Sequence, residues 1–421
     1  MSFKAAEVGD VPASWHVEEL RFFLDLITYG FTNPMPDADE GPWKLTAKDV
    51  VDGRINYATA RRTTVDAFTK NLTDKSRPKL GDVLLTKDGS IGRVAVVDRE
   101  GVCINQSVAL LRPNKFIDPS FLKYLLFSPY YQGVMEGDSD GSTIKHIYIT
   151  RVDKMQLAVP PLAEQKEILL VVGSIDDRIT LLRETNATLE AMAQALFKSW
   201  FVDFDPVRAK LEGRTPEGMD EATAALFPDA FEESELGSVP RGWKSVRLDS
   251  ILELAYGKAL KAEQRKQGSV PVYGSGGITG WHDTALVSHP SIVVGRKGTV
   301  GSLFWESRPF FPIDTVFYVK SKQPLTYCFE LLKTMGLSDM NTDAAVPGLN
   351  RENAYRLLVP NAPKDVVAAF DSVVRSVRQQ IDHNAEQAQT LATLRDTLLP
   401  RLISGQLRLP EIVAELLESN V

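Results

Sequence analysis

Two long segments of the chain carry apolar residues at the alternating spacings of four and three that define a heptad repeat. The first segment runs through Val172, Ile175, Ile179, Leu182, Asn186, Leu189, Ala193, Leu196 and Trp200. The second, shifted by 202 positions, runs through Phe370, Val374, Val377, Ile381, Asn384, Ala388, Leu391, Arg395, Leu398 and Leu402. The pattern predicts one helix over about residues 162–201 and a second long helix near the C-terminus.

These two helices are expected to pair with each other in an intramolecular antiparallel coiled coil. If the two halves of the chain are related by a pseudo-two-fold axis, pairing Ile168 with Leu402 places Asn186 opposite Asn384. A buried asparagine pair would fix the register at some cost in stability. The alternative is that each helix packs on its own domain and the asparagines face water. A helix of this length measures about 60 Å, so it would act as a spacer.

The sequence before each helix also occurs twice, with alternating strand patterns punctuated by glycine. The matched stretches are "DVPASWHVEEL" (10–20) with "SVPRGWKSVRL" (238–248), "DGSIGRVAVVD" (88–98) with "KGTVGSLFWES" (297–307), and "KMQLAVPPL" (from Lys154) with "YRLLVPNAP" (from Tyr355). The order is the same in both halves, which indicates a tandem duplication. The predicted fold class is α+β: two duplicated α/β domains separated by two long helices that form the coiled coil.

We therefore expect five segments in the 421-residue chain. They are a first α/β domain (1–160), a central spacer helix (161–202), an acidic connector (203–236), a second α/β domain (237–360) and a C-terminal spacer helix (361–421). The start of the chain has no basic region followed by an apolar run, and no stretch has the roughly 20 apolar residues that span a bilayer. A cytoplasmic location is expected.

Charge is distributed unevenly along the chain, although the net charge is −7. Residues 203–235 hold ten carboxylates against three basic residues, whereas residues 241–322 hold twelve basic residues against six acidic ones. A weaker basic excess covers residues 48–112. A basic segment indicates a surface that could bind phosphate, and the alternative is a solvated face.

The stretch "VVGRKGTVG" in the second half predicts a short basic loop between two apolar strands. Arg296 has the geometry to contact guanine O6 and N7, Lys297 a phosphate, and the loop amides around Thr299 a phosphate oxygen. Candidates for the same DNA-binding face are Lys258, Tyr273 and Ser275. The alternative is a solvated hairpin.

The corresponding loop in the first half is "LTKDGSIGR", with Lys87, Ser90 and Arg93 as candidate DNA contacts. Asn105 and Gln106, just after it, have the side-chain amides that recognise adenine. Either amide could instead cap a strand.

Sequence signals of catalysis are missing. There is no GxxxxGK[ST] phosphate loop, the five histidines lack metal-ligand spacing, and Cys103 and Cys328 are expected to be buried thiols. A stand-alone methyltransferase or nuclease would need a cofactor loop or an acidic metal cluster. No catalytic and no metal residue is assigned.

Taken in order, these motifs resemble the specificity (S) subunit of type I restriction-modification systems. The resemblance covers nearly the whole chain and rests on "VPASW" and "VPRGW", "KLGDVLLTKDGSIGRVAV" and "CINQS", "PVYGSGGITGW" and "IVVGRKGTVG", and "VPPLAEQKEI" with "LFKSWFVDFDPVRAKLEGRTPEGM". One departure stands out: "LVPNAPKDVVAAF" in the second half lacks the acidic-Gln-Lys signature of "VPPLAEQKEI", so docking of partners at the two ends is expected to be unequal.

The resemblance implies a non-catalytic DNA-binding subunit with two target-recognition domains, each binding one half of an asymmetric, gapped site in double-stranded DNA. It implies that the helical regions dock two methyltransferase subunits, joined by motor-nuclease subunits. This chain would bind no cofactor; S-adenosylmethionine, ATP and Mg would belong to the partners. The competing interpretation is an architectural coiled-coil protein that bridges DNA without recognising bases.

Overall fold

The computed structural model describes residues 3–6, 9–137, 145–340 and 348–408. Contacts divide the chain into two compact units: unit 1 comprises Met1–Thr180 and Ala388–Val421, and unit 2 comprises Leu181–Gln387. Each unit therefore contains one sheet-rich domain, part of one long helix and the opposite part of the other. The five-segment division drawn from the sequence stays a prediction.

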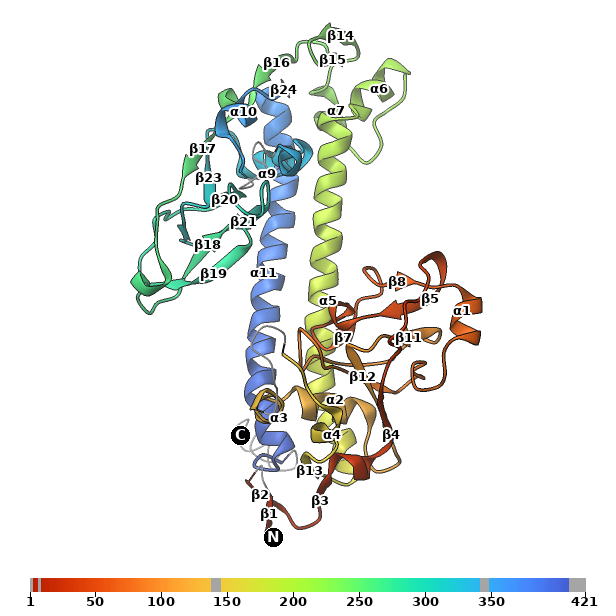
Figure 1. Ribbon diagram of the computed structural model, residues 1–421. Helices are drawn as coiled ribbons and strands as arrows, with labels where there is room; N and C mark the ends of the chain where they lie inside the picture. Colours follow the sequence, from red (N-terminus) through yellow and green to blue (C-terminus); the bar gives the residue numbers. More distant parts are fainter. Residues whose placement is uncertain (1–2, 7–8, 138–144, 341–347, 409–421) are drawn as a thin grey trace, which may run out of the picture. The chain divides into compact units, whose positions relative to one another are not determined.

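The two long helices are α5 (Leu162–Phe201) and α11 (Lys364–Ile403), each of 40 residues. The first has the bounds that the heptad pattern predicts. The helices lie side by side and run in opposite directions (Figure 1), so residue numbers rise along one as they fall along the other at each contact. The heptad positions of both are buried or half-buried, which confirms the antiparallel coiled coil.

The asparagine contact that the predicted register requires is present in unit 2. Asn384 Nδ2 donates to Asn186 Oδ1 at 2.8 Å, and Asn186 Nδ2 donates to the Ile381 carbonyl at 3.0 Å. Gln380 donates to Asn384 Oδ1 at 2.8 Å. The two amides thus bond to each other across the interface between the helices, which is the arrangement that penalises a shift in register.

Unit 1 is built around a four-stranded sheet in the order β10-β9-β12-β4, followed by a three-stranded sheet in the order β11-β5-β8. The strands are β1 Phe3–Ala6, β2 Gly9–Pro12, β3 His16–Glu19, β4 Leu24–Tyr29, β5 Ala38–Leu45, β6 Val50–Val51, β7 Arg54–Ile55, β8 Arg61–Arg62, β9 Val83–Thr86, β10 Val94–Val96, β11 Val102–Ile104, β12 Val108–Pro113 and β13 Gln156–Val159. Its helices are α1 Val65–Lys70, α2 Pro119–Phe127, α3 Pro129–Gly137 and α4 Ile149–Val152, with 3-10 turns at Leu20–Phe23 and Ala47–Asp49.

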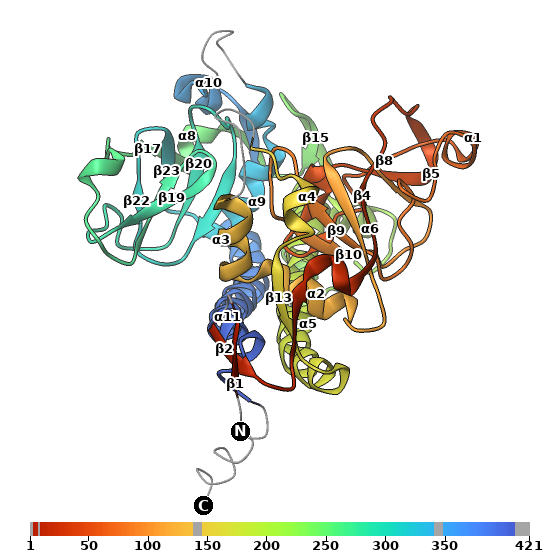
Figure 2. The same cartoon turned by 60° about the horizontal axis from the view of Figure 1, so that its bottom comes forward.

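Unit 2 repeats this topology. Its four-stranded sheet has the order β17-β23-β20-β21 and its three-stranded sheet the order β19-β18-β22. Strands β17, β23 and β20 lie next to one another in Figure 2. The strands are β14 Phe231–Ser234, β15 Gly237–Pro240, β16 Lys244–Arg247, β17 Leu252–Tyr256, β18 Val270–Gly274, β19 Gly277–His282, β20 Ser291–Gly295, β21 Leu303–Glu306, β22 Phe311–Pro312, β23 Val316–Ser321 and β24 Leu358–Asn361. The helices are α6 Asp205–Leu211, α7 Glu221–Ala225, α8 Leu248–Ile251, α9 Leu325–Thr334 and α10 Arg351–Tyr355, with 3-10 turns at Ala262–Gln264 and Leu337–Asp339.

Each sheet order matches strand by strand: β4, β9, β10 and β12 correspond to β17, β20, β21 and β23. Both three-stranded sheets contain one parallel pair, β5 with β11 and β18 with β22. The duplication seen in the sequence is therefore a duplication of topology. Unit 1 adds the helix α1 and the hairpin β6–β7.

The segment expected as an acidic connector contributes to the core of unit 2. Phe204, Val207 and Phe227 are buried in the same apolar cluster as Trp243. Asp220 caps α7 by accepting from the Thr223 amide at 2.7 Å. Its acidic residues are mainly on the surface, while its apolar residues fix the end of α5 to the domain.

The glutamine of the "AEQKE" signature is a buried structural residue. Gln165 donates to the carbonyls of Phe116 and Pro160 at 2.9 and 2.8 Å and accepts from the Asp118 amide at 2.7 Å. It is fully buried, so it joins the first turn of α5 to the loop before α2. In unit 2 the position is Val367, also buried. The glutamine of the signature thus makes a fold contact in unit 1, and the expected inequality of docking at the two ends stays a prediction.

Candidate nucleic-acid interface

The loop of unit 2 after β20 is held by its backbone. The amides of Arg296 and Lys297 both donate to the Thr315 carbonyl, at 2.9 and 3.1 Å, and the Leu349 amide donates to the Arg296 carbonyl at 2.8 Å. Gly295 packs so closely that a Cβ there would lie 2.1 Å from the Thr299 carbonyl oxygen. The backbone is thus fixed while the side chains project from it, which suits a recognition loop.

Several predicted DNA-binding side chains of unit 2 are brought together at this end of the sheet. Lys297, Thr299 and Lys258 are exposed. Ser275 joins them, because its hydroxyl accepts from the Thr299 amide at 3.4 Å and its carbonyl accepts from Ser302 at 2.5 Å. Arg296 is half-buried and donates to the Asp314 carbonyl at 3.0 Å.

Tyr273, the remaining candidate of unit 2, is a core residue. Its ring is buried, and its hydroxyl donates to Glu306 at 3.0 Å. Burial and the neighbouring carboxylate both raise the pKa of Tyr273, so its hydroxyl stays a donor to Glu306. Arg308 also contacts the Glu306 carboxylate, with Nε 3.0 Å from Oε1.

The corresponding loop of unit 1 has a different charge balance. Lys87 is buried and forms an ion pair with Asp88, Nζ to Oδ2 at 2.8 Å, and His146 contacts the other oxygen of that carboxylate. The positive charge of Lys87 is therefore already matched. Ser90 and Arg93 are exposed; the Arg93 guanidinium donates to the Val50 carbonyl at 3.2 Å.

Of the two amides expected to recognise adenine, Asn105 is already engaged. Its side-chain oxygen accepts from the amide and hydroxyl of Ser107 at 3.1 and 2.6 Å, so it caps the turn before β12. Gln106 is exposed beside it. Gln106 is the amide whose side chain is presented at the surface.

The tyrosines that end β4 and β17 were not among the residues that the sequence pattern predicts to bind DNA. Tyr29 and Tyr256 are 45% and 48% exposed, and each has a basic group over its ring: Lys87 Nζ at 5.4 Å and Arg296 Cζ at 4.9 Å. Both precede a glycine whose absent Cβ would lie about 2 Å from a backbone carbonyl. The repeated Tyr-Gly pair after an alternating strand is the signal that could have located them.

The placement of the His, Cys, Asp and Glu side chains within the described residues bears on metal binding. The described residues contain no cluster of three or more His, Cys, Asp or Glu side chains arranged to hold a metal ion. Cys103 and Cys328 are buried, as predicted, and burial raises the pKa of their thiols to about 12 and about 11. Within the described part of the chain no helix is both long and apolar enough to span a bilayer.

The chain thus contains two copies of an α/β domain on antiparallel helices, and each copy has a loop with basic residues at the end of its four-stranded sheet. These features define the class as a DNA-binding protein with two equivalent domains. The family described as "Type I restriction modification DNA specificity domain" matches residues 36–191 and 240–350. The chain therefore belongs to the family of type I restriction-modification DNA specificity subunits. Such subunits are non-catalytic components of these systems and act with DNA and with the other subunits.

Individual relatives agree with this assignment. The type I restriction enzyme MjaIX specificity subunit of Methanocaldococcus jannaschii is 24% identical over 97% of this chain and 97% of its own length. The HindI specificity subunit of Haemophilus influenzae is 27% identical over 79% of this chain and 88% of its own. The crystal structure of the S subunit from M. genitalium has a TM-score of 0.55 at 20% identity and covers 96% of this chain and 99% of that one, which shows a shared fold.

Proposed function

We propose that this chain recognises an asymmetric, two-part DNA site, with one α/β domain binding each part. The observation that carries the proposal is the pair of equivalent loops, after β9 and after β20, each joined to the same antiparallel helices. A protein that only bridged DNA would have no need for two loops with the same backbone and different side chains. Membership of the specificity family also favours base recognition over bridging.

The residues proposed to form the two DNA-binding surfaces, directly or by supporting them, are Lys87, Ser90, Arg93, Asn105 and Gln106 in unit 1, and Lys258, Tyr273, Ser275, Arg296, Lys297 and Thr299 in unit 2. The exposure and hydrogen bonds of each residue indicate which of them could contact DNA directly. The exposed basic residues suit phosphate and base contacts, whereas Asn105 and Tyr273 support the surface from within. Arg296 is the strongest candidate for a base contact, because its backbone is fixed on both sides.

Partners and cofactors follow from the same proposal. Two methyltransferase subunits would dock on the helical regions, and motor-nuclease subunits would join them in the cytoplasm. This chain would bind no cofactor of its own, and S-adenosylmethionine, ATP and Mg would be held by the partners. Methylation of adenine and cleavage of DNA would be activities of the assembled complex.

Selection from random DNA tests the function directly. The chain is co-expressed with its methyltransferase partner, bound duplexes are recovered at moderate salt, and their sequences are determined. The expected result is a motif in two parts separated by a gap of fixed length. Tight, salt-sensitive binding without any sequence motif would instead support the architectural protein.

Two neighbouring substitutions separate base contacts from phosphate contacts. Arg296→Ala is expected to cost about 1–3 kcal/mol on the preferred site and to relax selection at one position of the motif. Lys297→Ala is expected to weaken binding of all sequences and to reduce the salt dependence of log K by about one unit of slope. Titrations on matched and mismatched duplexes at several salt concentrations measure both. Unchanged base selectivity in Arg296→Ala would reject its assignment.

A further inference from the structure

The exposed tyrosine at the end of β17 lies beside two arginines from different parts of unit 2. Arg296, from the loop after β20, and Arg351, from the start of α10, each place the guanidinium carbon 4.9 Å from the centroid of the Tyr256 ring. At these distances a guanidinium is attracted to the face of an aromatic ring. Nearly half of the Tyr256 side chain remains exposed, so these groups lie at the surface.

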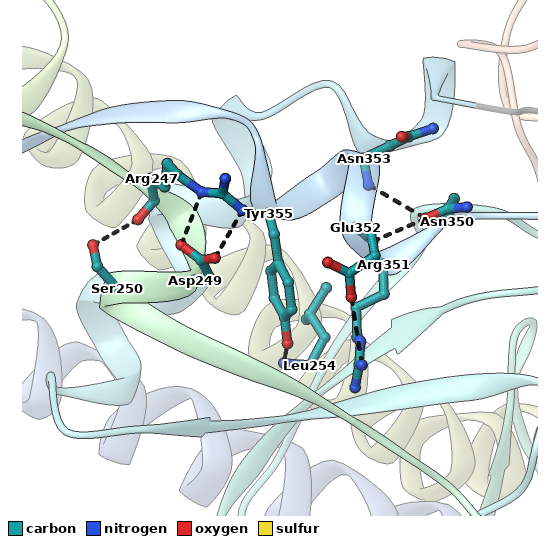
Figure 3. A network of polar contacts seen from close by, with 9 residues as sticks. All are labelled: Arg247, Asp249, Ser250, Leu254, Asn350, Arg351, Glu352, Asn353 and Tyr355. Carbon is teal, nitrogen blue, oxygen red and sulfur yellow. Dashed lines mark hydrogen bonds and ion pairs between the residues drawn. The ribbon is translucent and has the colours of Figure 1, made fainter.

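A hydrogen bond joins strand β17 and helix α10, the elements that carry Tyr256 and Arg351. Leu254, in the edge strand β17, donates its amide to the Tyr355 hydroxyl at 2.8 Å, and the Asn350 side chain caps α10 by accepting from the amides of Glu352 and Asn353 (Figure 3). Tyr355 and Arg351 belong to the same short helix. The contact therefore fixes Arg351 relative to the strand that ends in Tyr256.

The equivalent position in unit 1 lacks this arrangement. Tyr29 carries one basic group, Lys87, whose charge is paired with Asp88. The residue at the start of α4 is Ile149 where α10 begins with Arg351. Two guanidinium groups thus lie at the tyrosine of unit 2, although Arg351 also contacts Glu352 at 3.5 Å, and one ammonium group, paired with Asp88, lies at the tyrosine of unit 1.

We propose that Tyr256 is a positioning residue for DNA recognition, which holds the guanidinium groups of Arg296 and Arg351 toward the duplex. This inference rests on the proposed function and adds residues that it does not assign. A free arginine side chain loses much conformational freedom when it binds, and stacking on a fixed ring removes part of that loss beforehand. Tyr256 then orders two guanidinium groups before DNA binds, whereas Tyr29 in unit 1 has one buried ammonium group over its ring.

Substitutions of Tyr256 in the full chain, with its methyltransferase partner, test this role. Tyr256→Phe keeps the ring and is expected to bind and select as the parent does. Tyr256→Ala is expected to bind the selected duplex about 10-fold more weakly and to relax the same part of the motif as Arg296→Ala. Tyr256→Leu, which preserves apolar contact with Phe317 but not the aromatic face, should resemble Tyr256→Ala. Tyr29→Ala serves as the matched control and should change affinity about 2-fold at most.

The outcomes distinguish this role from others. Wild-type affinity and selectivity in both Tyr256→Ala and Tyr256→Leu would overturn the proposal. Equal losses in Tyr256→Phe and Tyr256→Ala would also overturn it, because the hydroxyl would then contact DNA directly. In a double-mutant cycle, Tyr256→Leu is expected to have little further effect once Arg296 and Arg351 are alanine. If the parent chain selects no two-part motif, the proposed function fails. If the parent chain selects such a motif and the Tyr256 variants bind and select as the parent does, only the role of Tyr256 is rejected.

Discussion

Replacing Trp243 with alanine is expected to lower the free energy of unfolding of unit 2 by about 3–5 kcal/mol. Trp243 belongs to the "VPRGW" motif and is 1% exposed. Its ring packs against Phe201 at the end of α5, and against Phe204 and Phe227 of the following segment, at centroid distances of 6.0, 5.7 and 6.4 Å. Its removal leaves a large cavity where the helix, the segment after it and the sheet domain meet.

Urea denaturation followed by circular dichroism measures the loss, and hydrogen exchange locates it. Faster exchange should be confined to residues 181–387. Trp281→Ala is the matched control, because Trp281 is 48% exposed and the same atoms are removed from a solvated site; we expect a change of about 0.5 kcal/mol or less. Equal destabilisation by the two variants would show that Trp243 does not organise this core.

Features set by local pattern were predictable from the sequence. The heptad spacing gave α5 its bounds, and the duplicated motifs indicated two equivalent domains, because each depends on residues close together in the chain. The contact between Asn186 and Asn384 followed from one further assumption, the pseudo-two-fold relation of the halves. The apolar setting of both cysteines was likewise predictable.

Features that depend on convergence of distant residues were not predictable. Lys87 was expected at the DNA surface, but Asp88 and His146, which lies 58 residues beyond that aspartate, enclose its charge. Tyr273 was assigned by its place beside a glycine-rich turn, yet the strand pleat directs its ring inward to Glu306. Short-range periodicity does not encode the strand order of the sheets. It also does not encode the contacts by which residues 145–148, before α4, and 348–350, before α10, reach the loops after β9 and β20.

Equivalent positions of the two long helices make different polar contacts with the two domains. In unit 1, Asp176 of α5 accepts from the Tyr124 hydroxyl of α2 at 2.5 Å and pairs with Arg395 of α11 at 2.7 Å. The residue of α11 equivalent to Asp176 is Arg378, which pairs in unit 2 with Glu330 of α9 at 3.5 Å. Helix α5 thus presents an acid to the domain of unit 1, and helix α11 presents a base to the domain of unit 2.

Arg378 gives the sharper test of these contacts, because it is 4% exposed and Glu330 is 1% exposed. The guanidinium also lies over the rings of Phe329 and Trp305, at 4.5 and 5.3 Å. Arg378→Ala is expected to cost about 3–5 kcal/mol, since it removes this packing and leaves the buried Glu330 carboxylate with Lys333 alone. Arg401→Ala, at an exposed position of the same helix, should cost about 0.5 kcal/mol or less.

A double variant separates the charge from the packing. Within the described residues, Arg378 Nε and Nη2 and Glu330 Oε2 are buried without a hydrogen-bond partner, so desolvation offsets much of the attraction between the two groups. Arg378→Met with Glu330→Leu keeps the volume, removes both charges, and is expected to regain most of the stability that either single variant loses. Urea denaturation of the four proteins gives the coupling energy. A double variant that loses the sum of the single losses would show that the residues act independently, and the packing of α9 against α11 would then rest on its other contacts, which include the hydrogen bond from the Thr326 hydroxyl to Asp371 at 2.6 Å.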